Sequence, residues 1–173
     1  MINSGTHILW PCMIPRTSRK IFFFHASNLS SQIWKSCINL SSLVWCFRYV
    51  ASSFGWSAKS KQAEMREPGT RLLVLHDNTP ENVLGFISWQ VDIEDDEAVI
   101  YWYTLLLLQS DHSYELQLSP RIQRSGLGRQ LMNLLEQIGS SFHLSKAMLT
   151  VFTSNISALN FYTTLGYPSS LPS

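Results

Sequence analysis

The chain has 173 residues, of which 45% are hydrophobic and 14% are charged, and its formal net charge at pH 7 is +1. This length and apolar content suit one compact domain with its own core. The near-zero net charge gives no general support for nucleic-acid binding, and no apolar stretch approaches the roughly 20 residues that a membrane helix needs. The charge is unevenly placed, because the first acidic residue is Glu64 and acids then gather between Asp92 and Glu97.

The cysteines and histidines give no sign of a metal site or a disulfide framework. Cys12, Cys37 and Cys46 are odd in number and lack metal-ligand spacing, and the five histidines are scattered. An odd set of unpatterned cysteines favours a reducing compartment. We therefore assign no metal.

The N-terminal part of the chain divides into a segment without a pattern and a segment with helical spacing. Residues 1–30 mix Pro, Ser, Thr and aromatics without a sustained period, and we interpret them as an irregular leader before a domain over residues 31–173. From Gln32 to Val50 the apolar residues keep near-helical spacing. The stretch "SSFGWSAKSKQAEM" predicts a loop and a short polar helix, and Pro68-Gly69 predicts a turn.

The middle of the chain has the alternation of antiparallel strands. The run "RLLVLHDNTPENVLGFISWQVDIEDDEAVIYWY" contains β-rich segments separated by turn clusters at residues 77–80 and 94–97. Within "FISWQVDI", every second residue belongs to a largely apolar face and the others to a mixed face. This pattern predicts an antiparallel meander.

The C-terminal part predicts a strand, helix, strand, helix order. "YELQL" is the first strand, and leucines from Leu127 onward mark an apolar helix face with Gly139 as the expected stop. "AMLTVF" is the next strand, and "SNISALNFYTTLGY" is a helix capped by Ser154 or Asn155 and ended by Gly166. A parallel βα unit after an antiparallel meander predicts an α/β domain on a mixed sheet.

The loop from Gln123 to Arg129 has the features of an anion site. Glycines allow a sharp turn and close approach of a ligand, and the first helical N–H groups lack internal partners. The loop lacks the Gly-Lys-Ser/Thr of a nucleoside-triphosphate loop, because Arg129 follows Gly128, and it lacks the third glycine of a dinucleotide fingerprint. By itself, the pair of glycines could equally make a tight strand-to-helix turn and nothing more.

Two motifs in order are more specific than the loop alone. Gln123 to Gly128 reads Q-x-x-G-x-G, and Asn155 to Tyr167 reads N-x-x-A-x-x-F-Y-x-x-x-G-Y. Over roughly Phe54 to Tyr167 the chain thereby resembles the GCN5-related N-acetyltransferases (GNAT). The resemblance implies acetyl-CoA as cosubstrate and the GNAT fold, a mixed and mostly antiparallel sheet with a parallel βα cofactor unit, flanked by helices.

Longer segments resemble one branch of this family. "YELQLSPRIQRSGLGRQLMNLLEQI", "KAMLTVFTSNISALNFY", "SSFGW" and "KQAEMRE" are similar to the histone-specific N-terminal acetyltransferases of the D type, in their fungal form. This resemblance implies acetylation of the α-amino group of histones of the H-four and H-two-A types, which start Ser-Gly-Arg-Gly. It also implies a nuclear and cytoplasmic location, no direct nucleic-acid binding and no membrane, and we expect a monomer.

The resemblance assigns roles residue by residue. The cofactor-binding set consists of Leu116, Gln117 and Leu118, which would present main-chain groups to the pantetheine arm, of Arg124, Ser125, Gly126, Leu127, Gly128 and Arg129, which would hold the pyrophosphate, and of Asn155. The substrate-binding set consists of Tyr49, Asp92, Ile93, Glu94, Tyr114 and Thr150. Tyr114 and Glu115 are the implied catalytic residues, with Glu115 in the place of the general base.

Elementary chemistry agrees with these roles but leaves simpler ones open. A free α-amine ordinarily has a pKa of about 8, so a base such as Glu115 must remove a proton before the nitrogen attacks a thioester. The acidic run could attract a basic tail or could be only a solvated hairpin turn. Glu115 could be a solvated strand-end carboxylate, Asn155 only a helix cap, and Tyr162 either a general acid or a core aromatic.

Two departures from the family put the activity in doubt. The family has one residue between the two tyrosines that precede the cofactor strand, whereas Tyr101 and Tyr114 are separated by the insertion "WYTLLLLQSDHS". The family also continues into a final strand where this sequence has "PSSLPS", so we expect the last strand to be missing. Alternative functions are therefore another GNAT acetyltransferase acting on lysine or small amines, or an impaired variant that only binds coenzyme A.

Overall fold

The computed structural model describes residues 19–50, 57–77, 79, 82–94, 96–104, 116–144, 146–151 and 155–168, with the backbone alone at some helix and strand positions. Its elements, in chain order, are β1 (Lys20–His25), η1 (Ala26–Asn28), α1 (Ser31–Val50), α2 (Ala58–Glu64), β2 (Arg71–His76), β3 (Val83–Glu94), β4 (Glu97–Thr104), β5 (Leu116–Leu118), η2 (Pro120–Ile122), α3 (Leu127–Ser141), β6 (Lys146–Val151) and α4 (Ile156–Leu165). Across these residues, every helix is too short or too polar to be a candidate membrane span.

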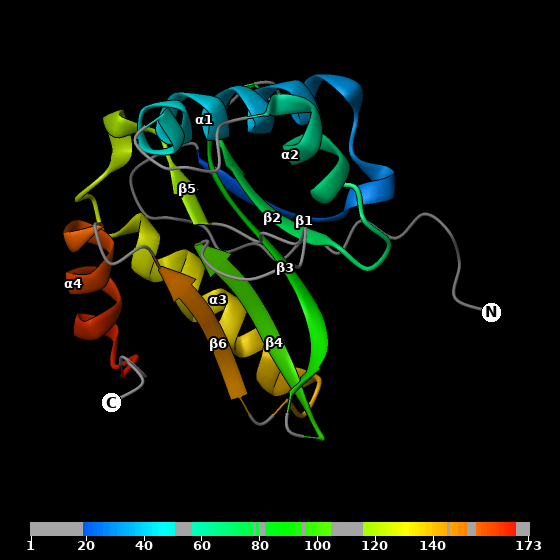
Figure 1. Ribbon diagram of the computed structural model, residues 1–173, viewed down its shortest axis with the longest axis vertical. Helices are drawn as coiled ribbons and strands as arrows, with labels where there is room; N and C mark the ends of the chain where they lie inside the picture. Colours follow the sequence, from blue (N-terminus) through cyan, green and yellow to red (C-terminus); the bar gives the residue numbers. More distant parts are fainter. Residues whose placement is uncertain are drawn as a thin grey trace.

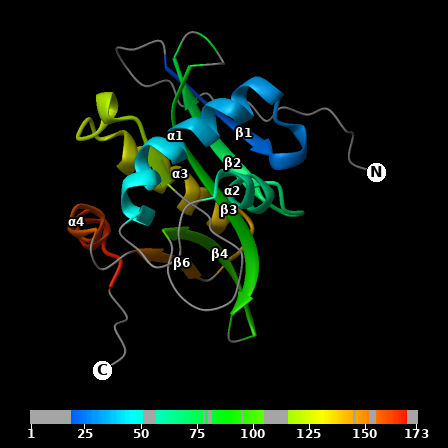
Figure 2. The same ribbon diagram turned by 45° about the horizontal axis from the view of Figure 1, so that its top comes forward.

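The strands form one mixed sheet between two helical layers. Their order is β1-β2-β3-β4-β6, with β5 paired to β3, and every pairing is antiparallel except that of β4 with β6. Helices α1 and α2 cover one face, and α3 lies on the other (Figure 1, Figure 2). The predicted mixed sheet with a parallel βα unit is confirmed.

The two faces of β3 carry the two halves of the core, as the alternation predicts. Ile87 and Trp89 are fully buried in the cluster that includes α3, whereas Phe86 is buried in the cluster that includes Trp34 of α1. Past Trp89 the α3 face of β3 becomes exposed, and Ile93 is 72% exposed. Helix α3 therefore covers only part of the length of β3.

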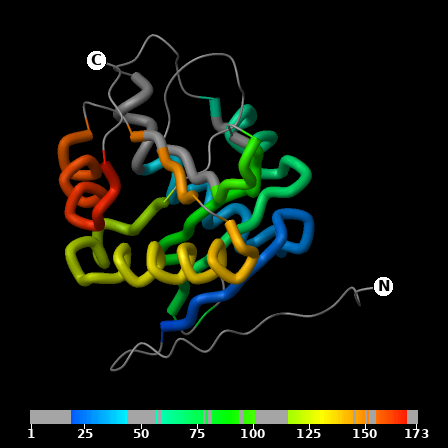
Figure 3. The backbone as a smooth tube through the Cα atoms, turned by 90° about the horizontal axis from the view of Figure 1, so that it is seen from below, coloured from blue at the N-terminus to red at the C-terminus, as the bar shows by residue number. Residues whose placement is uncertain are grey.

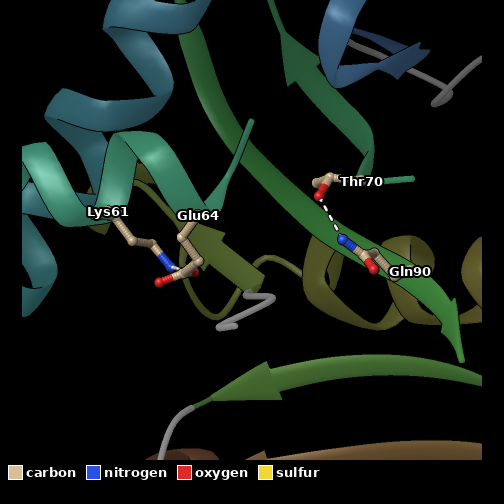
Figure 4. Close-up of polar contacts among 4 residues, drawn as sticks. All are labelled: Lys61, Glu64, Thr70 and Gln90. Carbon is tan, nitrogen blue, oxygen red and sulfur yellow. Dashed lines mark hydrogen bonds and ion pairs between the residues drawn. The ribbon is translucent and has the colours of Figure 1, made fainter. Parts of the chain in front are cut away.

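Two polar contacts support the face that carries α1 and α2 (Figure 4). The side chain of Gln90 donates from Nε2 to Oγ1 of Thr70 at 2.8 Å, which ties β3 to the turn before β2. On α2, the buried Lys61 donates to Oε1 of Glu64 at 2.7 Å. Because both ends of each contact are satisfied, these polar groups can be buried beside the core.

The interpretation of residues 1–30 as an irregular leader is wrong for Lys20–His25. These residues form β1, which pairs with β2 along its whole length, from Lys20 opposite His76 to His25 opposite Arg71. Three successive phenylalanines at residues 22–24 are each half-buried, so both faces of this strand contact other side chains. An edge strand that is apolar on both faces has no period of two, which explains why the pattern was missed.

The expectation that Gly139 ends the helix is also wrong, because α3 continues to Ser141. A Cβ atom added to Gly139 would lie 3.3 Å from Cγ2 of Ile100 on β4. The glycine therefore allows close approach of the helix to the sheet. The helix ends two residues later, at Ser141, and His143 in the turn that follows has a left-handed φ of 58°.

Strands β4 and β5 lie end to end along the same edge of β3 (Figure 1). Tyr101 of β4 pairs with Gln90, and Leu116 of β5 pairs with Ile87. A step of three residues along β3 thus corresponds to fifteen residues along the partner, so the pairing is out of continuous register by twelve residues. This offset equals the length of the expected insertion, residues 102–113. Strands β4 and β5 therefore pair with successive parts of β3, as a single uninterrupted strand would.

Candidate functional site

A pocket of about 520 Å³ opens between β5, the loop that follows it, and helix α4. Its lining residues come from the strand, from the glycine-containing loop with the first turn of α3, and from α4 with its cap: Leu116, Gln117, Leu118, Gln123, Arg124, Gly126, Gly128, Arg129, Asn155, Ser157, Ala158, Asn160, Phe161, Tyr162 and Thr164. Figure 3 shows α4 beside α3 on this side of the molecule. Three separate segments of the chain thus meet at one cavity.

The loop before α3 is held in place by its own hydrogen bonds. Gln123 donates from Nε2 to the carbonyl of Leu118 at 3.0 Å, and the hydroxyl of Ser125 donates to the carbonyl of Ile122. Gly126 is the N-cap of α3 with a φ of 83°, a left-handed conformation that glycine adopts without strain. The loop's own hydrogen bonds and the left-handed glycine therefore define the turn.

Gly128 allows the two walls of the pocket to meet. A Cβ atom at this position would lie 3.2 Å from Cζ of Phe161 on α4 and 3.3 Å from Cδ1 of Leu118 on β5. Both distances are shorter than ordinary contacts, so any larger residue would force the walls apart. The second glycine of the loop thus serves packing, whereas Gly126 serves the backbone turn.

The electrostatics of the pocket favour an anion. The N-termini of α3 and α4 both line it, and neither helix has an acidic residue in its first turn. Unpaired N–H groups and the helix dipole give each N-terminus a partial positive charge. Arg124 and Arg129 are exposed at the mouth, and neither forms an ion pair with a described carboxylate. A phosphate-bearing ligand fits this arrangement.

Strand β5 leaves one edge open to the pocket. It pairs with β3 through Leu116, Gln117 and Leu118, and within the described ranges no strand pairs with its opposite edge. The carbonyl of Leu118 already accepts a hydrogen bond from Gln123, but an open strand edge presents its other main-chain groups to a ligand that lies along it. This is the geometry that a pantetheine arm, with its amide groups, would use.

Most of the predicted cofactor residues line this pocket, and two do not. Ser125 uses its hydroxyl within the loop, and Leu127 is 2% exposed and packs in the core. Sequence reasoning missed Gln123 as a lining residue and the α4 wall around Phe161. The helical spacing of Ser157, Phe161 and Thr164 could have indicated this wall, because residues three and four apart share a face.

Four of the predicted substrate residues lie on described strands, Asp92, Ile93 and Glu94 on β3 and Thr150 on β6. Asp92 is exposed, and its Oδ1 accepts a hydrogen bond from the N–H of Ile93 at 2.8 Å. The side chain of Ile93 points to the opposite face, so only its main chain can act beside Asp92. The registers of the β3–β4 and β4–β6 pairs place positions Glu94 and Thr150 on the same face of the sheet as Asp92.

The remaining predicted residues cannot be located in this way. Tyr49 lies near the end of α1 with its backbone alone described. Tyr114 and Glu115, the implied catalytic pair, lie outside the described residues, and their roles stay predictions. Among the described residues, no group of three or more His, Cys, Asp or Glu side chains could hold a metal ion.

The acidic run is partly neutralised, which the sequence did not indicate. Nζ of Lys146 on β6 lies 3.1 Å from Oε2 of Glu97, and both side chains are about half exposed. An exposed pair of this kind adds little to stability, roughly 0–1 kcal/mol. It does reduce the negative charge at the hairpin, so Asp92 and its neighbours on β3 carry more of the charge offered to a ligand.

Comparison with known proteins connects the geometry to a family. Residues 38–167 match the acetyltransferase (GNAT) family. Among solved structures, the chain is similar to an aminoglycoside acetyltransferase from an uncultured soil metagenomic sample in complex with sisomicin, with a TM-score of 0.64, 14% identity, and 90% of this chain and 93% of that chain covered.

Two further structures are similar at the same level. A Bacillus halodurans protein gives a TM-score of 0.63 at 14% identity, with 88% of this chain and 96% of that chain covered. A Trypanosoma brucei acetyltransferase gives a TM-score of 0.57 at 17% identity, with 90% and 96% covered. At these identities the likeness shows the fold alone.

Proposed function

Because the chain belongs to the acetyltransferase (GNAT) family, we propose that it transfers the acetyl group of acetyl-CoA to the α-amino group of basic protein N-termini, of the histone type that begins Ser-Gly-Arg-Gly. The observation that carries the acetyl-CoA half of this proposal is the pocket where two helix N-termini, Arg124, Arg129 and the open edge of β5 converge. The peptide half rests on the resemblance of the cofactor strand and on the acidic face of β3.

The spacing along β3 suits an extended peptide. Ile87 pairs with Leu116 at the pocket, and Asp92 lies five residues further along the strand. At 3.4 Å per residue this is about 17 Å, the reach of roughly five extended residues. A tail with its α-amine at the thioester could therefore bring an early arginine toward Asp92 and Glu94. Long-range attraction between a basic tail and these acids would also favour encounter.

The proposed chemistry needs a base, an electrophile and a donor for the developing negative charge. Bound acetyl-CoA supplies the thioester. Glu115 takes a proton from the α-ammonium group, directly or through water, because the charged amine is not a nucleophile. The amine nitrogen forms the new C–N bond, the C–S bond breaks, and the leaving thiolate takes up a proton. Main-chain N–H groups on the edge of β5 are the nearest candidates to stabilise the oxyanion.

The test is a comparison of two peptides. One begins Ser-Gly-Arg-Gly with a free α-amine, and the other has the same sequence with its α-amine already acetylated and its lysines intact. We expect turnover with acetyl-CoA on the first peptide only. Equal turnover on both would contradict an α-amine acceptor and favour lysine.

A small polycationic amine is the second candidate acceptor. It is favoured by the fold shared with an enzyme solved with sisomicin and by the same acids, since an exposed carboxylate attracts any polyamine. Turnover of sisomicin at a higher kcat/KM than the free-amine peptide would support it over the first candidate. We also propose that the protein acts as a monomer in the nucleus and cytoplasm, where histone substrates are found.

A further inference from the structure

Helix α4 forms one wall of the cofactor pocket, so its position sets the width of the pocket. The lining residues from this wall start at the cap residue Asn155 and end at Thr164. At its middle the helix is fitted against the other wall, where the ring of Phe161 meets Gly128. What holds the C-terminal end of α4 therefore bears on cofactor binding, although the residues after Thr164 do not line the pocket.

The C-terminus of α4 forms a Schellman motif. Gly166 has a φ of 97°, its N–H donates to the carbonyl of Thr163 at 3.0 Å, and the N–H of Tyr167 donates to the carbonyl of Tyr162 at 3.1 Å. This pattern of bonds directs the residue after the glycine back along the helix. Here it brings the ring of Tyr167 edge-on to that of Tyr162, with centroids 6.2 Å apart. Tyr162 is 4% exposed and lines the pocket.

The hydroxyl of Tyr167 then crosses to α3. It donates a hydrogen bond to Oε1 of Glu136, which lies two turns beyond Gly128 on the same helix. Partial burial, followed by this bond to Glu136, raises the pKa of Tyr167 above its usual value, so the hydroxyl stays protonated and remains a donor. Helix α4 is thus joined to α3 at two levels, by Phe161 against Gly128 and by Tyr167 against Glu136.

We propose that Tyr167 is a positioning residue for the cofactor site: its bond to Glu136 holds α4 against α3 and thereby sets the affinity for acetyl-CoA. Tyr167 does not line the pocket, and it acts through Tyr162 and the helix that carries Phe161. The inference rests on the proposed binding of acetyl-CoA in this pocket, but it is independent of the identity of the acceptor.

The decisive variant is Tyr167→Phe, which keeps the ring and removes the donor. Losing one hydrogen bond of this kind should raise the Kd for coenzyme A about three- to tenfold. The KM for acetyl-CoA should rise by the same factor while kcat stays within about twofold, because the reacting groups are untouched. Binding is measured by calorimetry on the full chain, at a temperature where the variant is fully folded.

Variants of the partner separate positioning from general destabilisation. Glu136→Gln keeps an acceptor and should retain most of the affinity, whereas Glu136→Ala should match Tyr167→Phe. The double variant of Tyr167→Phe with Glu136→Ala should be no weaker than either alone, because one bond is lost in all three. Gln137→Ala, on the exposed surface of α3, is the matched control and should bind as the unmodified chain does.

The outcomes that would overturn the inference are distinct from failure of the proposed function. A Tyr167→Phe variant with a lower Tm but an unchanged Kd would show that Tyr167 supports the fold alone. Additive losses in the double variant would show that the two residues act separately. If the unmodified chain binds no coenzyme A, the cofactor assignment falls and the inference with it, whereas failure to acetylate the peptide leaves the binding result intact.

Discussion

The two glycines of the loop are needed for different reasons. Gly126 is open on the side where a Cβ would be added, so its glycine is needed for the left-handed φ, whereas Gly128 has a helical backbone and is needed for space. We expect Gly128→Ala to weaken coenzyme A binding about tenfold, equal to about 1.4 kcal/mol, because the methyl group pushes Phe161 and Leu118 apart. Calorimetric titration measures the change.

A second substitution tests the cause of that loss. Phe161→Leu added to Gly128→Ala makes room for the methyl group and should recover part of the affinity. If the pair binds as weakly as the sum of the two single losses, the clash is not the reason for the weaker binding.

Asn155 has two roles that can be separated by substitution. Its Oδ1 accepts a hydrogen bond from the N–H of Ala158 at 3.3 Å, which caps α4, and its side chain lines the pocket. Asn155→Asp keeps the cap, so thermal stability should hold, but its negative charge should lower affinity for coenzyme A. Asn155→Ala should cost about 1 kcal/mol of stability as well. Equal affinity of Asn155→Asp and the unmodified chain would contradict an anion at this helix end.

At the scale of whole elements, the split between β4 and β5 is the feature that most affects activity. Removing residues 102–113 would join the two strands in unbroken register with β3. The deletion also removes Trp102–Thr104, the end of β4 that pairs with β6, and the residues from Tyr114 onward would take their places in the joined strand. Because a longer connection costs more entropy to close, this deletion should stabilise the chain by about 1–2 kcal/mol. Chemical denaturation measures the gain, and a loss of stability would contradict the identification of this stretch as an insertion.

A second deletion distinguishes a straight strand from a bulged one. Removing residues 103–113 keeps Trp102 and restores the single residue that the family has between its two tyrosines. Three residues would then face Ser88 and Trp89 of β3, which is a β-bulge, a feature common beside active sites. We expect turnover of the free-amine peptide to rise in this variant relative to the full chain. Unchanged or lower turnover in both deletions would show that the insertion does not limit catalysis.

Elements with a clear period could be predicted from sequence, and those that depend on contacts between segments could not. The β3 alternation and the cap at Asn155 are local signals, and both are confirmed. Strand β1 was not predicted because its phenylalanines are partly buried on both faces of the strand, so the sequence shows no alternation. Gly139 looked like a helix stop because its actual role, close approach to Ile100, involves a strand far away in sequence. The Tyr167–Glu136 bond joins two helices and leaves no local pattern.

At the scale of the whole molecule, charge is divided between two regions. The pocket has Arg124, Arg129 and two helix N-termini, whereas the β3–β4 hairpin carries Asp92 and the acids that follow it. Figure 1 shows the hairpin and β5 at different ends of the sheet. The net charge of +1 is a sum over the whole chain, so it does not reveal that positive and negative charges lie in different regions. An anionic cofactor and a cationic tail would thus each meet a region of opposite sign.

This division predicts how salt affects the two substrates. At saturating acetyl-CoA, the KM for the Ser-Gly-Arg-Gly peptide should rise with ionic strength, because added salt screens exposed charges. Asp92→Asn should raise that KM at low salt and flatten its salt dependence. Glu67→Gln, on the turn before β2, is a control outside the hairpin. A salt response of Asp92→Asn that matches the unmodified chain would show that Asp92 does not attract the peptide.

The end-to-end arrangement of β4 and β5 also bears on how the chain would behave if it were cut. A break between Thr104 and Leu116 would interrupt connectivity without removing a rung of the described sheet. The two fragments would still share the β3–β5 antiparallel pairing and the β4–β6 parallel pairing, together with a core to which both contribute. A nicked molecule should therefore migrate as one particle and separate only on denaturation. The same position could accept a foreign domain or serve as new termini in a circular permutant.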